Sequence, residues 1–296
     1  MIFANEIHIA CNRAGTDEQS ILNVISQCSM EDLQQVSRAY YVSFGKPIYN
    51  LLKNEISGKF REIILGSFEG RYQYWIRQIR EAIKAADEKA FIELVIMGNT
   101  YDWFQIKEQY FKTYDRNVVD DILKVLNNIA KNADWVRLLS GWIFQMRYPR
   151  CQPENDADEL YKAAKGAGTD VNTFIRLFCS TTNEEFVQIA RIYQEKYKIP
   201  LRQTIIIEFS GKSEKVFLLA HDYLLSPIKG CCWIINNSIN CSRDKSLVDI
   251  TVLFRDQYSS EILQVYKESF GNLTKEIKQH CSGWFEKALL SLWKAQ

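Results

Sequence analysis

Apolar residues recur at helical spacing along most of the chain. In one early stretch, the residues Ile21, Leu22, Val24, Ile25 and Cys28 follow the i, i+1, i+3, i+4, i+7 pattern of one helix face. Strand-like alternation is scarce, and only five prolines interrupt the 296 residues. The pattern therefore predicts an all-α protein built from several short helices.

The helical pattern is repeated four times. A pair of aromatic residues spaced by four marks each copy, and the pairs are Tyr40/Phe44, Tyr110/Tyr114, Tyr193/Tyr197 and Tyr266/Phe270. Such a period predicts stacked repeats, which we place at residues 1–69, 70–147, 148–221 and 222–296 and call repeats 1 to 4. A polar, proline-bearing stretch at residues 147–155 predicts the linker in the middle of the chain.

Alignment of the repeats also decides whether one ambiguous stretch is read as a strand or as a helix. Residues 204–207, Thr-Ile-Ile-Ile, are β-branched and could be read as a strand. Their place in repeat 3 matches Ile48, Leu51 and Leu52 of repeat 1, which favours a buried helix.

Capping residues predict where several helices begin. Thr16, with Gln19 three positions later, and Thr169 are the predicted N-caps that follow two glycine-containing turns. Further helix starts are predicted at Ser29, Thr100, Thr182 (with Glu185) and Ser260.

A glycine-rich turn is paired with a distant glutamate in two repeats. In repeat 3 the turn is Lys165-Gly166-Ala167-Gly168-Thr169-Asp170, and Glu208 lies forty residues after Gly168. In repeat 1 the turn is Arg13-Ala14-Gly15-Thr16-Asp17, and Glu55 lies forty residues after Gly15. One such turn alone would be read as a helix N-cap. Two turns with a matched glutamate favour a repeated oxygen-only metal site.

Calcium suits such a site because it accepts backbone carbonyls and carboxylates as ligands. The predicted ligands in repeat 3 are the carbonyls of Ala164, Gly166 and Gly168 with the Glu208 carboxylate. In repeat 1 they are the carbonyls of Cys11, Arg13 and Gly15 with the Glu55 carboxylate. A single carboxylate predicts micromolar or weaker affinity, and the open positions invite a lipid phosphate.

The turn, the glutamate and the Ser-Gly that follows it resemble the type II calcium signature of the annexin family. Four units of about 70 residues resemble the annexin core over the whole chain, and the degenerate repeats 2 and 4 resemble the protozoan α-giardin branch. The resemblance implies about five helices per repeat in a right-handed superhelical, slightly curved disc. It also implies calcium loops on the convex face and calcium-dependent binding to acidic phospholipids. For α-giardins it implies association with the plasma membrane, flagella or submembrane cytoskeleton.

The chain departs from the family pattern at several positions. Arg13 replaces the first glycine of the repeat 1 turn, which would be strained if this position required a positive φ. Repeat 2 has no glycine turn at residues 84–89, and His280 of repeat 4 replaces the glutamate, so neither is expected to hold calcium. Ala14 and Ala167 at the tips of the other two turns predict shallow insertion into a bilayer.

Composition excludes several classes of protein. A net charge of +1 argues against a nucleic-acid-binding surface. No stretch is apolar enough to span a membrane, and the first residues do not resemble a signal peptide. The eight cysteines show no framework spacing, so we expect reduced thiols in a cytoplasmic protein. No catalytic set is recognisable, and we expect a binding protein without enzymatic activity.

The sequence thus predicts calcium-dependent binding to acidic phospholipid on the inner face of the plasma membrane, linking membrane to cytoskeleton, by a protein monomeric in solution. An alternative remains open: a structural, cytoskeleton-associated protein that binds partners such as microtubules and whose calcium sites are largely vestigial.

Overall fold

The computed structural model describes residues 2–13, 15–144, 147–166 and 168–295, and within these ranges it contains helices and no strand. None of the helices described is long and apolar enough to cross a bilayer. In chain order the helices are α1 (Ile2–Cys11), α2 (Glu18–Gln27), α3 (Met30–Phe44), α4 (Ile48–Glu55), α5 (Gly58–Glu69), α6 (Arg71–Ala85), α7 (Glu88–Ile96), α8 (Thr100–Tyr114), α9 (Val118–Ala130), α10 (Asp134–Phe144), α11 (Pro153–Lys165), α12 (Val171–Ser180), α13 (Asn183–Tyr197), α14 (Leu201–Glu208), α15 (Gly211–Leu225), α16 (Pro227–Asn240), α17 (Asp244–Tyr258), α18 (Ile262–Ser269), α19 (Leu273–His280) and α20 (Gly283–Leu292).

These helices form four sets of five in two compact units. Unit 1 comprises Met1–Arg77 and Ile234–Gln296, and unit 2 comprises Gln78–Trp233. Repeats 1 and 4 therefore supply most of unit 1, whereas repeats 2 and 3 supply most of unit 2. The boundary between repeats that the sequence predicts at residue 221 lies inside α15, four residues before that helix ends.

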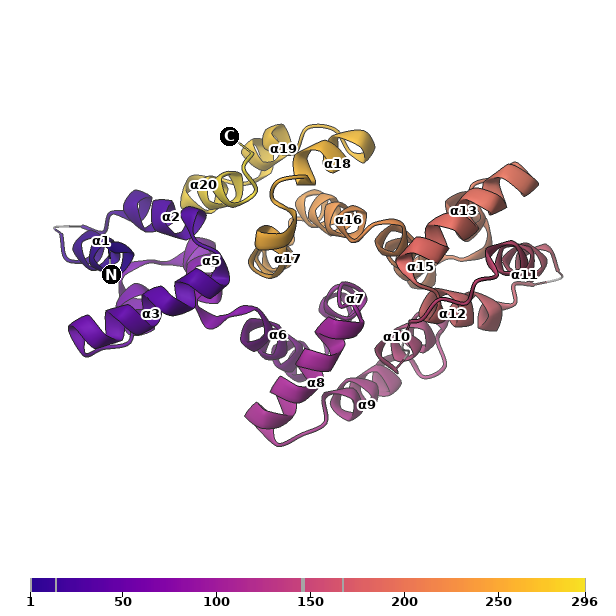
Figure 1. Cartoon of the computed structure of the whole chain (residues 1–296), viewed down its shortest axis with the longest axis horizontal. Helices are drawn as coiled ribbons and strands as arrows, with labels where there is room; N and C mark the ends of the chain where they lie inside the picture. The colour runs from indigo at the N-terminus through magenta and orange to yellow at the C-terminus, as the bar shows by residue number, and fades with distance from the viewer. Residues whose placement is uncertain (1, 14, 145–146, 167, 296) are drawn as a thin grey trace. The chain divides into compact units, whose positions relative to one another are not determined.

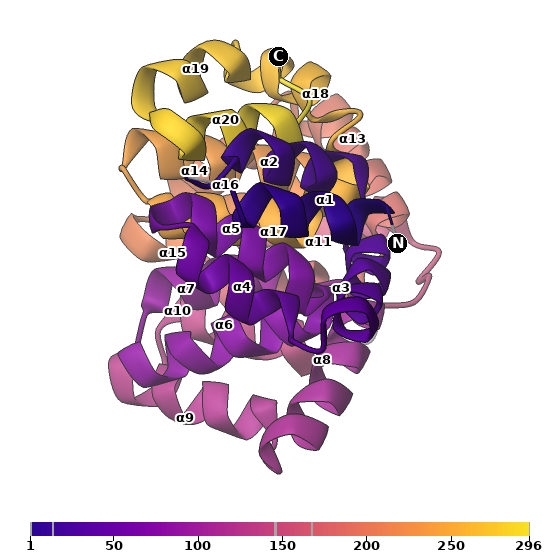
Figure 2. The same ribbon diagram turned by 90° about the vertical axis from the view of Figure 1, so that its left-hand side faces the viewer.

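In unit 1 the two ends of the chain pack together. Helix α5 contacts both α17 and α20, and α2 contacts α20, so the indigo and yellow helices lie side by side (Figures 1 and 2). The rings of Trp75 and Phe254 meet edge to face at 5.5 Å. The Trp293 indole N–H donates to the Thr251 hydroxyl at 2.9 Å, so its one polar atom is satisfied inside the core.

In unit 2 helix α10 contacts α12 and α15, and α11 lies along α13. The core of repeat 3 is aromatic. Phe178 packs edge to face against Phe186 at 5.0 Å and against Phe217 at 5.6 Å. All three rings are fully buried, so they contribute much of the apolar area that this repeat removes from water.

A buried arginine occupies an equivalent place in each unit. In unit 1, Arg255 donates to the carbonyls of Ile25 (2.7 Å) and Cys28 (3.1 Å) at the end of α2. In unit 2, Arg147 donates to the carbonyls of Phe178 and Thr181, both at 2.7 Å, at the end of α12. Carbonyls at a helix C-terminus lack partners within the helix, and each guanidinium satisfies two of them.

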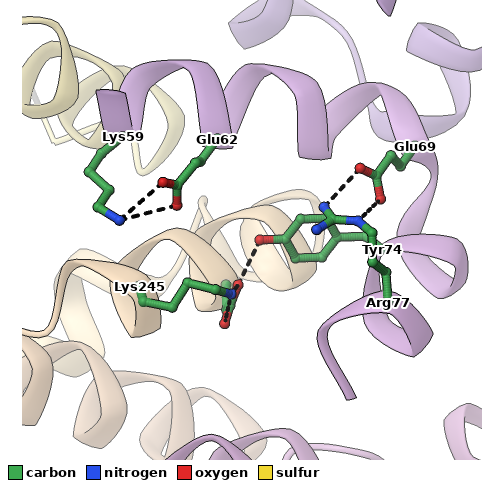
Figure 3. Close-up of polar contacts among 7 residues, drawn as sticks. Lys59, Glu62, Glu69, Tyr74, Arg77 and Lys245 are labelled. Atoms are coloured by element: carbon green, nitrogen blue, oxygen red, sulfur yellow. Dashed lines mark hydrogen bonds and ion pairs between the residues drawn. The ribbon is translucent and has the colours of Figure 1, made fainter. Parts of the chain in front are cut away.

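A buried polar cluster links α6 to α17 within unit 1 (Figure 3). The Tyr74 hydroxyl donates to Asp249 at 2.6 Å, and the Lys245 ammonium pairs with the same carboxylate. Burial raises the pKa of Asp249 and, together with the charge of Asp249, raises that of Tyr74 well above its ordinary value. Gly66 permits this approach, because a Cβ there would lie 2.5 Å from the Tyr74 ring.

Several predicted local features are confirmed. Residues 204–207 lie in helix α14, but the prediction that this helix is buried holds only for Thr204 and Ile205, since Ile206 and Ile207 are exposed. Ser29 caps α3 through a reciprocal capping box with Asp32. Thr182 caps α13 by accepting from the Glu185 N–H, but the predicted capping box is only half formed, because the Glu185 carboxylate accepts from the Arg150 and Cys151 N–H groups instead.

Two predicted helix starts are wrong. Asn99, not Thr100, caps α8, because the Asn99 side chain forms a capping box with Asp102. Helix α18 begins after Glu261, which gives no side-chain cap, so Ser260 is not its N-cap either.

Replacement of Tyr74 by Phe should destabilise unit 1. The buried Asp249 carboxylate would lose one of its hydrogen-bond donors, which costs about 1–3 kcal/mol for a charged group. We expect the midpoint of urea unfolding, followed by circular dichroism, to fall relative to wild type. Tyr41→Phe is the matched control because Tyr41 is exposed. Equal midpoints for the two variants would contradict a stabilising role for the Tyr74 hydroxyl.

Candidate metal sites

In repeat 3 the glycine turn and the distant glutamate lie against each other. The turn between α11 and α12 is closed by a hydrogen bond from the Asp170 N–H to the Ala163 carbonyl at 2.9 Å. The Thr169 hydroxyl donates to the Glu208 carboxylate Oε2 at 2.6 Å and lies 3.4 Å from the Glu208 main-chain oxygen. The structure thus joins the start of α12 to the end of α14, which are 39 residues apart in the chain.

Packing beneath the turn explains why the glutamate lies there. Phe209 follows Glu208 directly and is buried, with its ring stacked on Phe217 at 4.1 Å. The same ring meets Phe174 of α12 edge to face at 5.2 Å. Because Phe174 lies in the first turn of α12, this contact anchors the end of α14 below the glycine turn and directs the neighbouring carboxylate toward it.

Repeat 1 reproduces the arrangement without the aromatic rings. The Asp17 N–H donates to the Ala10 carbonyl at 2.9 Å and closes the turn. The Thr16 hydroxyl donates to the Glu55 carboxylate Oε2 at 2.9 Å and to the Glu55 carbonyl at 3.2 Å. Ile56, which follows Glu55, is buried as Phe209 is. Two repeats therefore bring the same pair of residue types together.

The predicted N-caps of these two turns are wrong. Asp17, not Thr16, caps α2 by accepting from the Ser20 N–H at 3.0 Å. Asp170 caps α12 in the same way, through the N–H groups of residues 172 and 173. The pKa of Asp17 is lowered chiefly by the Ser20 N–H, and that of Asp170 chiefly by the Thr173 hydroxyl. Since an aspartate serves as the cap, the threonine hydroxyl is free to contact the glutamate.

The two glycine positions of the turn have different backbone conformations. Gly15 and Gly168 have φ values of +88° and +104°, a region that residues with a side chain rarely adopt. Gly166 instead has φ −78° and ψ −179°, which any residue can adopt. Arg13, which aligns with Gly166, is not among the residues with positive φ. The strain considered for Arg13 therefore does not arise, and its guanidinium pairs with Asp17 at 3.5 Å.

Some of the predicted ligands lie near the glutamate in each of the two repeats. Ala164 and Glu208 line one groove, and the Gly168 oxygen would lie 3.4 Å from a Cβ on Gly166. In repeat 1, burial and the nearby Glu55 charge raise the pKa of the Cys11 thiol to about 12, which places Glu55 close to the end of α1. That the carbonyls of all six turn residues act as ligands stays a prediction. Ala14 and Ala167 lie outside the described residues.

Side chains alone would not make a metal site at either turn. No group of three or more His, Cys, Asp and Glu side chains converges within the part of the chain that the structure describes. Any ion held at these turns would therefore depend on main-chain oxygens, with one carboxylate from the distant glutamate.

Repeats 2 and 4 have a shorter turn. The closing hydrogen bond joins Asp87 to Ala82 and Arg243 to Ser238, a separation of five positions, whereas repeats 1 and 3 have seven. Asp87 still caps α7 through the N–H groups of Lys89 and Ala90. Helix α19 ends at His280, where α14 ends at a glutamate. Repeat 2 thus keeps the closing bond and an aspartate cap, whereas repeat 4 keeps only the closing bond, because Arg243 at the start of α17 provides no side-chain cap. Neither repeat keeps the glycine, the threonine or the carboxylate.

Comparison with known proteins matches this division. A family model described as Annexin matches residues 2–66 and 155–220, which are the repeats that carry the complete turn and glutamate. These parts of the chain are therefore annexin-like. Giardin subunit alpha-5 of Giardia intestinalis is 26% identical over 247 residues, covering 81% of each chain. Annexin A4 of Bos taurus is 27% identical over 305 residues, covering 98% of this chain and 92% of its own.

Solved annexin-type structures share the fold. The crystal structure of calcium-bound alpha-1 giardin has a TM-score of 0.89 at 23% identity and covers 100% of this chain and 99% of its own. The calcium-bound structure of alpha-14 giardin has a TM-score of 0.89 at 24% identity and covers 99% of this chain and 98% of its own. These likenesses support the annexin arrangement of four helical repeats.

Alanine substitution should distinguish the two glycines of the repeat 3 turn. Gly168→Ala forces a side chain into a left-handed conformation and should lower the free energy of unfolding by about 1–2 kcal/mol. Gly166→Ala is the matched control and should change it by less than about 0.5 kcal/mol, because its φ is ordinary. Urea unfolding in chelator measures both variants. Equal losses would show that the turn does not hold Gly168 at positive φ in solution.

Proposed function

We propose that this protein binds acidic phospholipid membranes in a calcium-dependent manner through the turns of repeats 1 and 3. Annexins are typically calcium-dependent phospholipid-binding proteins, and the relatives solved as calcium-bound giardins support calcium as the ion. Repeats 2 and 4 take no part in this proposal, because they lack the glycine, the threonine and the glutamate.

The observation that carries the proposal is the contact between threonine and glutamate in both repeats. A turn that served only to cap a helix would need its aspartate alone, as repeat 2 illustrates with Asp87. It would not need a hydroxyl that reaches a carboxylate 39 residues away at 2.6 Å in one repeat and 2.9 Å in the other. This additional contact holds Glu208 and Glu55 beside exposed, glycine-containing backbone.

The donor set fits a hard cation that accepts many oxygens. Calcium supplies a divalent charge that oxygen ligands from protein and lipid can share. Glu208 would provide one carboxylate, and the carbonyls of Ala164, Gly166 and Gly168 would provide neutral oxygens. In repeat 1 the corresponding groups are Glu55 and the carbonyls of Cys11, Arg13 and Gly15. One formal negative charge per site favours weak binding that an anionic lipid phosphate strengthens.

Removal of the carboxylate charge should weaken calcium-driven membrane binding. We expect wild type to sediment with vesicles containing phosphatidylserine at millimolar calcium and to be released by chelator. Glu208→Gln and Glu55→Gln should each raise the calcium needed for half-maximal sedimentation by about tenfold, since a charged ligand contributes on the order of 1.5–3 kcal/mol. The double variant should shift further still.

The control for this experiment is Glu195→Gln, which makes the same change on the exposed face of α13. Equal sedimentation of wild type with and without calcium would favour the alternative of a cytoskeleton-associated protein with vestigial sites. An unchanged calcium requirement in both single variants would exclude Glu55 and Glu208 as ligands.

The site of repeat 3 also carries apolar residues that repeat 1 lacks. A groove of about 200 Å³ beside Glu208 is lined by Tyr161, Ala164, Lys165, Tyr193, Ile199, Thr204, Ile207 and Glu208. Ile207 is 62% exposed and Ile206 is 37% exposed, although both are large apolar residues. The aligned residues of repeat 1 are Asn54 and Lys53. We expect the exposed isoleucines to enter the lipid surface next to the ion, which adds an apolar contact to the shallow turn tips.

Ile207→Asn should therefore weaken membrane binding without removing its dependence on calcium. The change makes repeat 3 resemble repeat 1 and removes about 1–2 kcal/mol of apolar contact, or roughly five- to thirtyfold in vesicle affinity at fixed calcium. Val187→Asn on α13 is the control, since Val187 is exposed but lies away from the turn. Equal vesicle affinities for the two variants would argue that Ile207 stays outside the lipid.

The same proposal covers location and partners. A protein that acts through calcium and acidic lipid would lie on the cytoplasmic face of the plasma membrane, where such lipids are concentrated. Contact with submembrane cytoskeleton is the further part of this proposal, and co-sedimentation with microtubules in the presence and absence of calcium measures it.

A further inference from the structure

A cavity in repeat 2 lies at the end of helix α7 that is farther from the short turn of the same repeat. It has a volume of about 180 Å³, and the residues that line it include Gly98, Trp103, Phe104, Lys107, Trp142 and Arg147. The C-terminal ends of helices α7 and α10 both lie at this cavity. The short turn at residues 85–88 lies at the other end of α7. An apolar cavity of about 150 Å³ is enough to hold benzene, so this one has room for an apolar group the size of one aromatic ring.

The walls of the cavity are aromatic and their polar atoms are already satisfied. The indole N–H of Trp103 donates to the Val95 carbonyl at 3.3 Å, and that of Trp142 donates to the Gly98 carbonyl at 3.4 Å. Gly98 must lack a side chain, because a Cβ would lie 2.8 Å from the Trp103 nitrogen. Phe104 and Phe144, which also line the cavity, are 62% and 58% exposed, so part of its apolar wall is accessible from solvent.

Two cations line this apolar cavity without an acidic partner. The Lys107 ammonium donates to the Ile143 carbonyl at 3.1 Å, and its pKa is lowered by burial. Arg147 donates to two carbonyls and stacks on the Trp142 ring at 4.2 Å, and burial lowers its pKa as well. Among the described residues no carboxylate pairs with either cation, and the Nη2 atom of Arg147 is buried without a hydrogen-bond acceptor.

The equivalent arginine of unit 1 also has a buried nitrogen without a hydrogen-bond acceptor, its Nε, but it has a carboxylate beside it. Arg255 reaches the same two carbonyl positions, but the Asp256 carboxylate lies 3.3 Å from its Nε. Desolvated cations are costly unless a negative charge compensates them. Arg255 has that charge within the chain, whereas none of the described residues that line the cavity of Lys107 and Arg147 is acidic.

We infer that this cavity binds a small organic anion that has an apolar body of about one ring and a single carboxylate beside Lys107 and Arg147. Trp103, Trp142 and the two exposed phenylalanines would enclose the body, and the two cations would select the acid over a neutral analogue. This site does not depend on the proposed membrane function, since it shares no residue with the turns and glutamates of repeats 1 and 3 and needs no metal ion.

The test uses phenylacetate as the probe and phenylacetamide as its neutral isostere. Both are titrated into the full-length protein in chelator and followed by ligand-observed nuclear magnetic resonance and by tryptophan fluorescence. We expect phenylacetate to bind with a millimolar or tighter dissociation constant and at least about tenfold more tightly than the amide, as expected for hydrogen bonds to a charged group. Equal affinity of acid and amide, or no binding of the acid, would overturn the inference.

A pair of variants identifies the cation involved. Lys107→Gln keeps a donor for the Ile143 carbonyl but removes the charge, and should weaken phenylacetate binding at least about fivefold. Lys112→Gln makes the same change on the exposed face of the same helix, where Lys112 pairs with Glu108, and should leave binding unchanged. Circular dichroism and the unchanged weak binding of the amide verify that the variant is folded. Equal phenylacetate affinities for the two variants would refute the assignment.

Discussion

The contact between a threonine in the turn and a glutamate at the end of a distant helix is the constraint on which both candidate sites depend. It exists only if buried side chains hold the start of α12 and the end of α14 together. In repeat 3 this is done by Phe209, whose ring packs on Phe174 and Phe217. A core contact and a surface contact are therefore consecutive along the chain, and the position of the Glu208 carboxylate follows from the burial of its neighbour.

The turns show that the fold and the site make separate demands on the sequence. All four repeats close the turn with one main-chain hydrogen bond, whether five or seven positions are spanned. Repeat 2 also keeps an aspartate cap, so helix geometry is satisfied there without glycine or glutamate. The two extra residues in repeats 1 and 3 are thus not needed to connect the helices. They lengthen the exposed backbone beside the glutamate, which is the property that a carbonyl-rich metal site requires.

Much of this arrangement could be predicted from the sequence because its causes are local or periodic. The helical class, the helix at residues 204–207 and the capping box at Ser29 follow from apolar spacing and cap chemistry. The equal spacing of glycine and glutamate in two repeats predicted that they would meet. The roles of Thr16 and Thr169 could not be predicted, because a threonine followed by an aspartate offers two possible caps, and only the position of a residue far along the chain decides between them.

Other features depend on distant contacts that no local pattern reveals. The sequence could not show that Arg13 needs no positive φ, since this depends on how the turn is closed across α1 and α2. Nor could it pair Tyr74 with Asp249, which are 175 residues apart and meet because α6 and α17 pack in one unit. The two cations of the repeat 2 cavity are another feature that depends on contacts between residues far apart in the chain. Lys107 and Arg147 are ordinary in the sequence, and what distinguishes them is that no carboxylate among the described residues pairs with them in the fold.

The net charge of each candidate site determines how the proposed membrane binding would depend on calcium and on acidic lipid. A divalent ion held by one carboxylate leaves the occupied turn with a net positive charge. The chain itself has a net charge of only +1, so an acidic membrane would gain little attraction from the metal-free protein. Lipid and ion must then strengthen each other's binding by the same factor, because the coupling between two ligands is reciprocal. A second carboxylate in each turn would tighten ion binding but cancel the charge that attracts the lipid. On this argument, a single glutamate per site suits a protein whose attachment to a membrane is meant to be reversible.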